Sequence, residues 1–513
     1  MLAADVFPFN SDEAVVALMA RHILAGDRPA FFYGQAYMGS LDAGLVALGF
    51  ALFGQHVIVI RVIQALLYAG TVATTVALAA RLLGTKAAGV MAGLLVAIPT
   101  VNVTLYTTAS LGGYGEALLI GNLLLLLGLK IADSPRVRWP YLAWGLLAGL
   151  GFWGFALLLV YIVPGAVFLL ATAFRRQGWR DGFIRLGILA VAAAIGATPW
   201  LVWALRNGLG PLVSELAGSA IAGASPAWPL LALGSHLRNL LLFGTTAIWG
   251  LRPPWEIRWL ALPLVPAALG FWLSVTVCAL LSLRRHDAGR AGRRMLAGVA
   301  VTLLAAFVLT PFGADPSGRY FLPLAVPMAL FAADLLLAVQ RRGAGRWACV
   351  LIAGILAFNL WGTVQSAVRN PPGLTTQFDA AARIDHRFDS ALIAFLEQNG
   401  ERRGYTNYWV AYPLAFLSGE DLVFVPRLPY HPDFRYTARD DRYAPYDDLV
   451  TASDRVAYIT TNHPALDERL RQGLAAAGAS FMEASIGDYH VFYRLSIPLR
   501  PEDIVPLRGA AAP

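Results

Sequence analysis

Residues 10–54 read NSDEAVVALMARHILAGDRPAFFYGQAYMGSLDAGLVALGFALFG, an acidic pair followed by a basic cluster and a short apolar stretch. Asn10 stands three residues before Glu13, a spacing typical of a helix start, and acids are favoured in a first helical turn. The stretch 39–54 is apolar but shorter than the roughly 20 residues of a spanning helix. It predicts a re-entrant or interfacial helix.

The rest of the chain has the composition of an integral membrane protein. Hydrophobic residues make up 57% of it and charged residues 14%, whereas a soluble chain is about one quarter charged. About ten apolar stretches have the length of a membrane span. They are 57–80, 87–106, 115–130, 140–156, 157–174, 186–204, 259–282, 295–312, 320–340 and 347–367. The run 140–174 is too long for one span, so we split it between Gly151 and Gly154.

Basic residues cluster in every second loop between these stretches. The positive-inside rule places the basic loops in the cytoplasm. Three segments then lie outside the cytoplasm: 1–56, which contains the acidic pair, the long loop 205–258, and the chain after about residue 368. An even number of spans puts both termini outside. Because nothing in the chain would carry residues 1–56 across the membrane, we expect a further helix before Met1.

Residues 372–513 differ from the apolar part of the chain. They are charged and aromatic, and they alternate helical and strand patterns. We expect helices at 388–400 and 463–478, strands at 421–426 and 455–461, and a hairpin over 480–496. The chain therefore divides into an external segment (1–56), a transmembrane helical domain (57–367) and an external α/β domain (372–513).

Several functional classes are excluded by the sequence. The net charge of +8 comes from arginines in short loops, which mark topology rather than a nucleic-acid surface. Cys278 and Cys349 both lie in apolar stretches, which excludes a disulfide framework and a cysteine zinc site. The phosphate-binding GxxxxGK[ST] and zinc-binding HExxH motifs are also missing. Acids at an outer membrane surface then indicate chemistry on a lipid-linked substrate.

Three acids are the catalytic candidates: Asp12, Glu13 and Glu116. A carboxylate of the Asp12-Glu13 pair can accept the proton of an acceptor hydroxyl as general base, while the alternative role of the pair is to cap a helix. Glu116 opens the third stretch, where an ionisable group is functional by default, although an acid also suits a helix N-terminus. Metal dependence stays open. A divalent cation, if there is one, is expected at Asp12 and Glu116.

Positive charge is needed to stabilise a phosphate leaving group, and aromatic rings stack on sugars. The alternative for each such residue is an ordinary position at the membrane interface. Arg319 stands apart as the cation of a tight external turn between two spans. The full set of substrate-binding candidates is Arg21, His22, Tyr33, Tyr37, Tyr114, Arg206, Arg252, Arg319 and Tyr320.

Over roughly residues 10–370 the sequence resembles the GT-C class of membrane glycosyltransferases, in the branch of protein O-mannosyltransferases and lipid A aminoarabinose transferases. Asp12-Glu13 matches the Asp-Glu motif of that family in its first external loop, and Glu116 matches a later acid. SGRYFLPLAVPMAL resembles the Arg-Tyr-x-x-Pro turn near the carrier phosphate. The sequence departs from the family in two ways. The first spanning helix of the family is absent, and so is a lysine that some members carry.

The resemblance implies a polytopic helical fold and transfer of a sugar from a polyprenyl-phosphate donor, with inversion, to a hydroxyl of a lipid, glycan or protein. Asp12 would be the base, with Glu13 and Glu116 in support. The composition, rich in Ala, Arg and Gly, indicates a bacterium, which makes the location the inner membrane with the site at the periplasmic face. The alternatives are a transporter or flippase of lipid-linked glycans and a non-catalytic scaffold.

Overall fold

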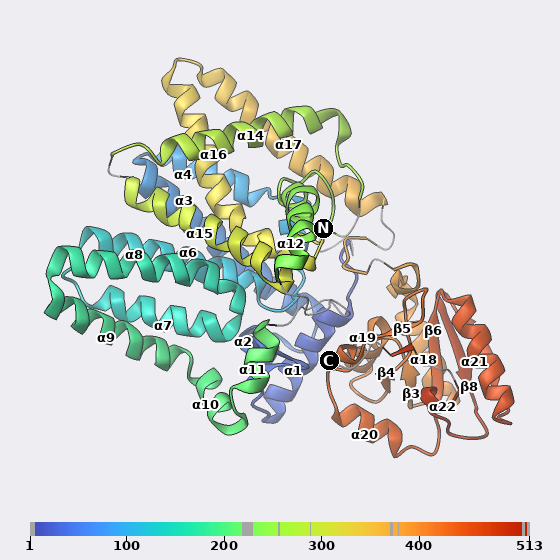
Figure 1. Ribbon diagram of the computed structural model, residues 1–513. Coiled ribbons are helices and arrows are strands. Elements are labelled where there is room, and N and C mark those ends of the chain that lie inside the picture. The colour runs from blue at the N-terminus through green and yellow to red at the C-terminus, as the bar shows by residue number, and fades with distance from the viewer. Residues whose placement is uncertain are drawn as a thin grey trace. The chain divides into compact units, whose positions relative to one another are not determined.

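The computed structural model describes residues 6–217, 229–254, 257–287, 289–369, 373–377, 379–504 and 508–509. The chain divides into two compact units (Figure 1). Unit 1 comprises Met1–Gln35, Ala43–Ile60 and Ala367–Pro513. Unit 2 comprises Ala36–Asp42 and Arg61–Ser366. Unit 1 therefore combines the start of the chain with its end.

Long apolar helices dominate unit 2. Seven helical segments of the described chain are long and apolar enough to cross a membrane, at positions that the sequence predicted. They are α3 (Val57–Leu83), α6 (Tyr114–Asp133), η2 (Ala156–Leu158) with α8 (Leu159–Gln177), η4 (Leu262–Leu264) with α14 (Val265–Ser282), α15 (Arg290–Leu309), η6 (Arg319–Leu324) with α16 (Ala325–Arg341), and α17 (Gly345–Arg369). The chain is thus a multi-pass membrane protein.

Two of the predicted spans are broken helices. The span 87–106 consists of α4 (Lys86–Ala97) and α5 (Val101–Thr108), bent by 75°, and the span 186–204 consists of α9 (Trp179–Gly196) and α10 (Thr198–Asn207), bent by 70°. Pro99 and Pro199 stand at these breaks, where proline removes a helical hydrogen bond. With each bent pair as one span, the described residues contain nine spans. The tenth predicted stretch is α7 (Trp139–Gly154), whose 16 residues are short for a span.

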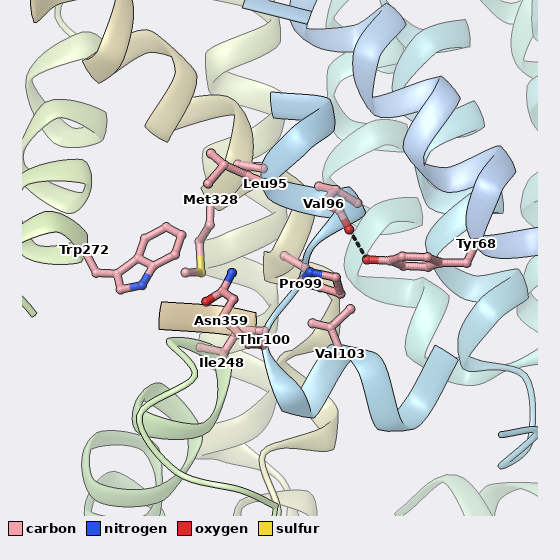
Figure 2. Close-up of a pocket in the computed structure, with 12 residues that line it drawn as sticks. Tyr68, Leu95, Val96, Pro99, Thr100, Val103, Ile248, Trp272, Met328 and Asn359 are labelled. Atoms are coloured by element: carbon pink, nitrogen blue, oxygen red, sulfur yellow. Dashed lines mark hydrogen bonds between the residues drawn. The ribbon is translucent and has the colours of Figure 1, made fainter. Parts of the chain in front are cut away.

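A small cavity of about 30 Å³ lies at the break between α4 and α5 (Figure 2). Two side chains there bind carbonyl oxygens near the end of α4. The Tyr68 hydroxyl donates to the Val96 carbonyl oxygen at 2.5 Å, and Asn359 Nδ2 donates to the Ile98 carbonyl oxygen at 2.9 Å. Carbonyl groups at a helix end lack helical partners, so these side chains stabilise the broken span.

Helices α6 to α9 run side by side in unit 2 (Figure 1). The split predicted between Gly151 and Gly154 is confirmed, because α7 ends at Gly154 and Phe155 is extended. Small residues let α7 and α9 approach closely. A Cβ atom at Gly149 would lie 1.9 Å from the Ala193 carbonyl oxygen, so only glycine fits there.

The stretch 205–258, predicted as one long loop, is helical over much of its described length. Its elements are the end of α10, α11 (Gly210–Ala217), α12 (Pro229–Asn239), the π-helical η3 (Leu240–Gly244) and α13 (Thr245–Ile248). The predicted connection between two spans therefore contains short helices. These helices are too short to span a membrane, which is why a search for long apolar runs does not find them.

The start of the chain supplies α1 (Ser11–Ala25), the short strands β1 (Phe31–Phe32) and β2 (Gln35–Gly39), and α2 (Leu41–Phe53). The apolar stretch 39–54 is therefore a 13-residue helix, as its length predicted. The rest of unit 1 is an α/β domain with a five-stranded sheet in the order β4-β3-β6-β8-β7. Strand β3 is parallel to β4 and β6, while β8 is antiparallel to β6 and β7.

The main elements predicted for this domain are confirmed. They are α18 (Asp389–Asn399), β4 (Val423–Pro426), β6 (Ala457–Thr461), α21 (Pro464–Ala476) and the hairpin of β7 (Met482–Ile486) and β8 (Tyr489–Tyr493). Sequence reasoning missed β3 (Arg403–Thr406) and α19 (Tyr408–Leu417). Short segments complete the domain: β5 (Arg435–Tyr436), η9 (Ala438–Asp440), α20 (Pro445–Thr451), α22 (Pro501–Ile504) and β9 (Arg508–Gly509). Helix α19 packs against α1 within unit 1.

Candidate functional site

Asp12 and Glu13 lie in the first turn of α1. The side chain of Asn10 caps this helix by accepting a hydrogen bond from the Glu13 backbone N–H at 3.1 Å, so the predicted helix start is confirmed. Neither acid serves as the cap residue. Glu13 is fully buried, whereas Asp12 is partly exposed. Of the two carboxylates, that of Asp12 is therefore the one that a substrate can reach.

Asp12 is held by a tyrosine from the far end of the chain. The hydroxyl of Tyr408, the first residue of α19, donates to Asp12 Oδ1 at 2.5 Å. Burial, together with the charge of Asp12, raises the pKa of Tyr408 well above its ordinary value. The phenol thus stays protonated and remains a donor to the carboxylate.

A further acid of the α/β domain lies within electrostatic reach of Asp12. Asp440 is buried, and burial raises its pKa to about 7 although the nearby Arg442 and His431 favour its charged form. Tyr430 hydrogen-bonds to Asp440. Sequence reasoning did not single out Asp440. The signal available was a loop rich in aromatic residues and both charges, PYHPDFRYTARDDRYAPYDD.

Three of the predicted substrate-binding residues, Arg21, His22 and Tyr33, lie in unit 1. They gather not around Asp12 but around Glu420. His22 Nε2 and Arg21 Nη1 lie 2.9 and 3.5 Å from its carboxylate, and Tyr33 contacts the other ring nitrogen of His22 at 2.9 Å. Burial alone would raise the pKa of Glu420, but hydrogen bonds from His22 and Tyr446 lower it to about 2. Arg21 and His22 follow Asp12 by two to three turns of α1, about 14 Å along the axis. They form a separate, structural cluster.

Glu116 lies in unit 2, in the first turn of α6, beside the carboxyl group of Asp42. Asp42 accepts hydrogen bonds from Gln64 Nε2 at 2.8 Å, from the Ser110 hydroxyl and from the Gly113 backbone N–H. Both carboxyl oxygens of Glu116 are buried, and their near neighbours among the described residues are the Asp42 carboxyl group and the backbone N–H of Glu116 itself. Two adjacent buried carboxyls cannot both be charged unless a cation compensates them.

Asp42 is a candidate that sequence reasoning missed. It opens an apolar helix as Glu116 does, so the same pattern could have marked it. Gly113, with φ +88°, caps α6 in the left-handed conformation that glycine adopts without strain. The glycines before Glu116, expected to let a ligand approach the backbone, thus also turn an N–H toward Asp42.

Arg319 and three predicted tyrosines gather in unit 2. Arg319 Nε lies 2.6 Å from Asp315 Oδ2, and its Nη2 donates to the Tyr320 hydroxyl at 3.3 Å. Tyr114 interacts electrostatically with Arg319, with Tyr320 and with Tyr37. The arginine is therefore paired with an acid. Its guanidinium group also lies near phenol groups, and cation and phenols together suit a phosphate.

An apolar cavity of about 230 Å³ adjoins this group. Tyr37 and Tyr320 line it together with side chains of α8 and α15, among them Leu303 and Phe307. The cavity wall is almost wholly hydrocarbon, while Tyr320 connects it to the guanidinium group of Arg319. This arrangement suits a ligand with an apolar chain and an anionic head group.

The two remaining arginines have other surroundings. Arg252 is buried and donates to the carbonyl oxygens of Phe243, Pro253 and Pro316. Burial lowers its pKa to about 10. Arg206 is exposed in the last turn of α10. The structure assigns Arg252 to the packing of α12, η3 and α13, because its donors are used by backbone carbonyls.

Among the described residues no group of three or more His, Cys, Asp or Glu side chains is arranged to hold a metal ion. Asp12 and Glu116, the expected ligands of a cation, belong to different units. Glu116 and Asp42 are the acids that the structure brings together, and two carboxyl groups are the start of an oxygen site for a hard cation.

Comparisons with known proteins agree with this architecture. Residues 43–203 match the sequence model of the dolichyl-phosphate-mannose-protein mannosyltransferase family. No curated protein matches the sequence. The fold is similar to that of ArnT from Cupriavidus metallidurans bound to undecaprenyl phosphate, with a TM-score of 0.56, 14% identity, and 97% of this chain and 95% of ArnT covered.

The oligosaccharyltransferase of Archaeoglobus fulgidus, in complex with Zn and sulfate, is also similar in fold. Its TM-score is 0.51 at 14% identity, and the match covers 94% of this chain and 68% of that one. The family match and the shared architecture confirm the resemblance: this multi-pass membrane protein has the fold of the GT-C glycosyltransferases.

Proposed function

We propose that the protein transfers a sugar from a polyprenyl-phosphate donor to a hydroxyl group of a cell-envelope acceptor. The observation that carries this proposal is the cavity of about 230 Å³ in unit 2, whose Tyr320 contacts Arg319. A polyprenyl chain needs an apolar wall, and a phosphate leaving group needs positive charge beside it. ArnT, similar in fold, binds undecaprenyl phosphate, which supports this donor class.

In the proposed reaction Asp12 is the general base. It takes the proton from the acceptor hydroxyl as that oxygen attacks the anomeric carbon of the sugar. The bond from the anomeric carbon to the phosphate oxygen breaks, and the polyprenyl phosphate leaves with the bonding electrons. A single displacement of this kind inverts the anomeric centre. Arg319, Tyr320 and Tyr114 stabilise the charge that develops on the phosphate.

We place the reaction at the periplasmic face of a bacterial inner membrane. This location rests on the alternation of basic and non-basic loops, which puts Asp12, Arg319 and the α/β domain outside the cytoplasm. The acceptor is a lipid, glycan or protein hydroxyl. Glu13 and Glu116 are proposed to support the site, and a divalent cation beside Glu116 and Asp42 would compensate their charge.

A donor panel tests the proposal. Purified protein in liposomes is incubated with polyprenyl-phosphate sugars and with nucleotide sugars, and release of polyprenyl phosphate is measured. We expect turnover with a lipid-linked donor and none with a nucleotide sugar. Ala306→Trp, which fills the cavity from α15, should raise the KM for the lipid donor about tenfold, whereas Val301→Trp on the exposed side of α15 should not. Equal use of nucleotide sugars, or an unchanged KM in Ala306→Trp, would contradict the proposal.

A further inference from the structure

The first turn of α1 is fixed by residues that come more than 360 positions later in the chain. Asn10 Nδ2 donates to the Thr376 hydroxyl at 3.2 Å, and the Ser11 hydroxyl donates to the Tyr408 carbonyl oxygen. The ring of Phe9 packs on that of Phe416 in α19, with centroids 5.5 Å apart. All of these residues belong to unit 1. The backbone around Asp12 therefore has a defined place against α19.

The side chain of Tyr408 is itself immobilised. It is 3% exposed, and the guanidinium group of Arg442 lies 5.4 Å from the centre of its ring. The neighbouring Tyr412 holds the turn that carries Arg442, because its hydroxyl accepts from the Arg442 backbone N–H at 2.5 Å and donates to the Asp440 carbonyl oxygen at 3.1 Å. The phenol of Tyr408 thus has one direction in which to donate, toward Asp12.

We infer that Tyr408 is a positioning residue for Asp12. Its hydroxyl engages Oδ1, and Tyr408 is the hydrogen-bond partner of this carboxylate among the described residues. The second oxygen, Oδ2, is then the one that receives the proton of the acceptor hydroxyl. This inference rests on the proposed role of Asp12 as base. It gives the α/β domain a part in the reaction, because a base works only when its oxygen is held in the right direction.

Other charged and titratable groups face the same place. Tyr430 and Asp440 both interact electrostatically with Asp12, while Arg442 lies over Tyr408. Because Asp440 itself titrates near neutral pH, a profile of rate against pH contains its contribution as well as that of Asp12. A test of Tyr408 must separate these two acids, and Asp440→Asn does so.

The experiment compares wild type with Tyr408→Phe in the liposome transfer assay over a range of pH. We expect kcat to fall about tenfold, the size of effect of one hydrogen bond, while the KM for the lipid donor stays the same. The fall in kcat without a change in KM is the mark of a misaligned base, since the donor still binds as in wild type. The same fall should appear when Tyr408→Phe is made in an Asp440→Asn background.

Tyr458→Phe is the matched control. It also removes a buried hydroxyl of unit 1, which donates to the Leu499 carbonyl oxygen at 2.6 Å, and it leaves the contact with Asp12 intact. We expect it to lower the melting temperature without lowering kcat. Wild-type kcat in Tyr408→Phe, or the same loss of kcat in Tyr458→Phe, would overturn the inference while leaving the proposed function standing. Absence of transfer by wild type from every lipid-linked donor would overturn both.

Discussion

Asp12 and Glu13 are adjacent in sequence but face different surroundings, because successive helical residues are turned by about 100°. Glu13 is buried in unit 1, whereas Asp12 reaches the surface and the hydroxyl of Tyr408. The pattern of residues alone gave capping and catalysis equal weight. The structure assigns the cap to Asn10, as the helix-start spacing predicted, and the catalytic role of Asp12 remains a proposal.

At the same scale, Glu420 is expected to stabilise the fold. Its pKa of about 2 lies below its ordinary value, so its contribution is present above about pH 4.5 and is lost as the pH falls toward 2. Glu420→Gln should lower the free energy of unfolding by about 1–2 kcal/mol at pH 7, because the hydrogen bonds from His22 and Tyr446 lose their charge assistance. Thermal unfolding in detergent at pH 7 and pH 4 measures the difference.

The control for this prediction is Glu397→Gln, an exposed glutamate on α18. It should unfold like wild type at both pH values. If Glu420→Gln is as stable as this control at pH 7, the cluster of Arg21, His22 and Tyr33 does not hold the end of α1 in the way described. A difference that grows on acidification would contradict the sign of the pKa shift.

At the scale of elements, the broken span α4–α5 depends on side chains that replace lost helical bonds. Asn359 lines the cavity at this break (Figure 2), and Asn359→Leu keeps a similar volume but removes the donor to the Ile98 carbonyl oxygen. A buried carbonyl without its donor costs about 1–3 kcal/mol, so the melting temperature should fall by several degrees. Tryptophan fluorescence during heating in detergent follows the transition.

Asn207→Leu is the matched control, since that exposed amide bonds only within its own helix, α10. It should leave the melting temperature within about one degree of wild type, as surface changes usually do. An Asn359→Leu variant that melts with this control would show that the Asn359 amide does not stabilise the break.

Sequence patterns predict a helix or strand well when the spacing of its apolar residues and the length of the segment both indicate the same kind of element. Long apolar spans, α18, α21 and the β7-β8 hairpin are of this kind. Helix α19 was missed because all of its residues are apolar or aromatic and Pro413 lies inside it, so neither a helical nor a strand period appears. The bends at Pro99 and Pro199 carried a signal, since the residue before proline disfavours helix, but the angle of a bend depends on tertiary packing.

At the scale of the whole molecule, unit 1 is assembled from both ends of the chain. The sequence predicted Asp12 as a candidate, but not its contact with Tyr408, because no local pattern links residues nearly 400 positions apart. The pairing of Asp42 with Glu116 could not be predicted for the same reason, since the two residues are 74 positions apart. Arg319 and Tyr320 were predicted together in one turn, and the structure adds Tyr37 and Tyr114 beside them and the acid, Asp315, that pairs with the arginine.

The fold alone does not give the activity, since related folds carry different chemistry. The likeness to ArnT and to the archaeal oligosaccharyltransferase is at 14% identity, and the family match covers residues 43–203, which exclude Asp12 and Arg319. The proposed reaction therefore rests on two local arrangements, Asp12 with Tyr408 in unit 1 and Arg319 with its tyrosines in unit 2.

The most direct test of the account is the rate of sugar transfer by Asp12→Asn in liposomes, with the lipid-linked donor that wild type uses. The amide keeps the shape of the side chain but cannot take a proton, so the rate should fall at least 100-fold, the lower end of what a general base contributes. Asp27→Asn, an exposed acid just beyond α1, should keep the wild-type rate. Equal rates for wild type and Asp12→Asn would contradict the central claim.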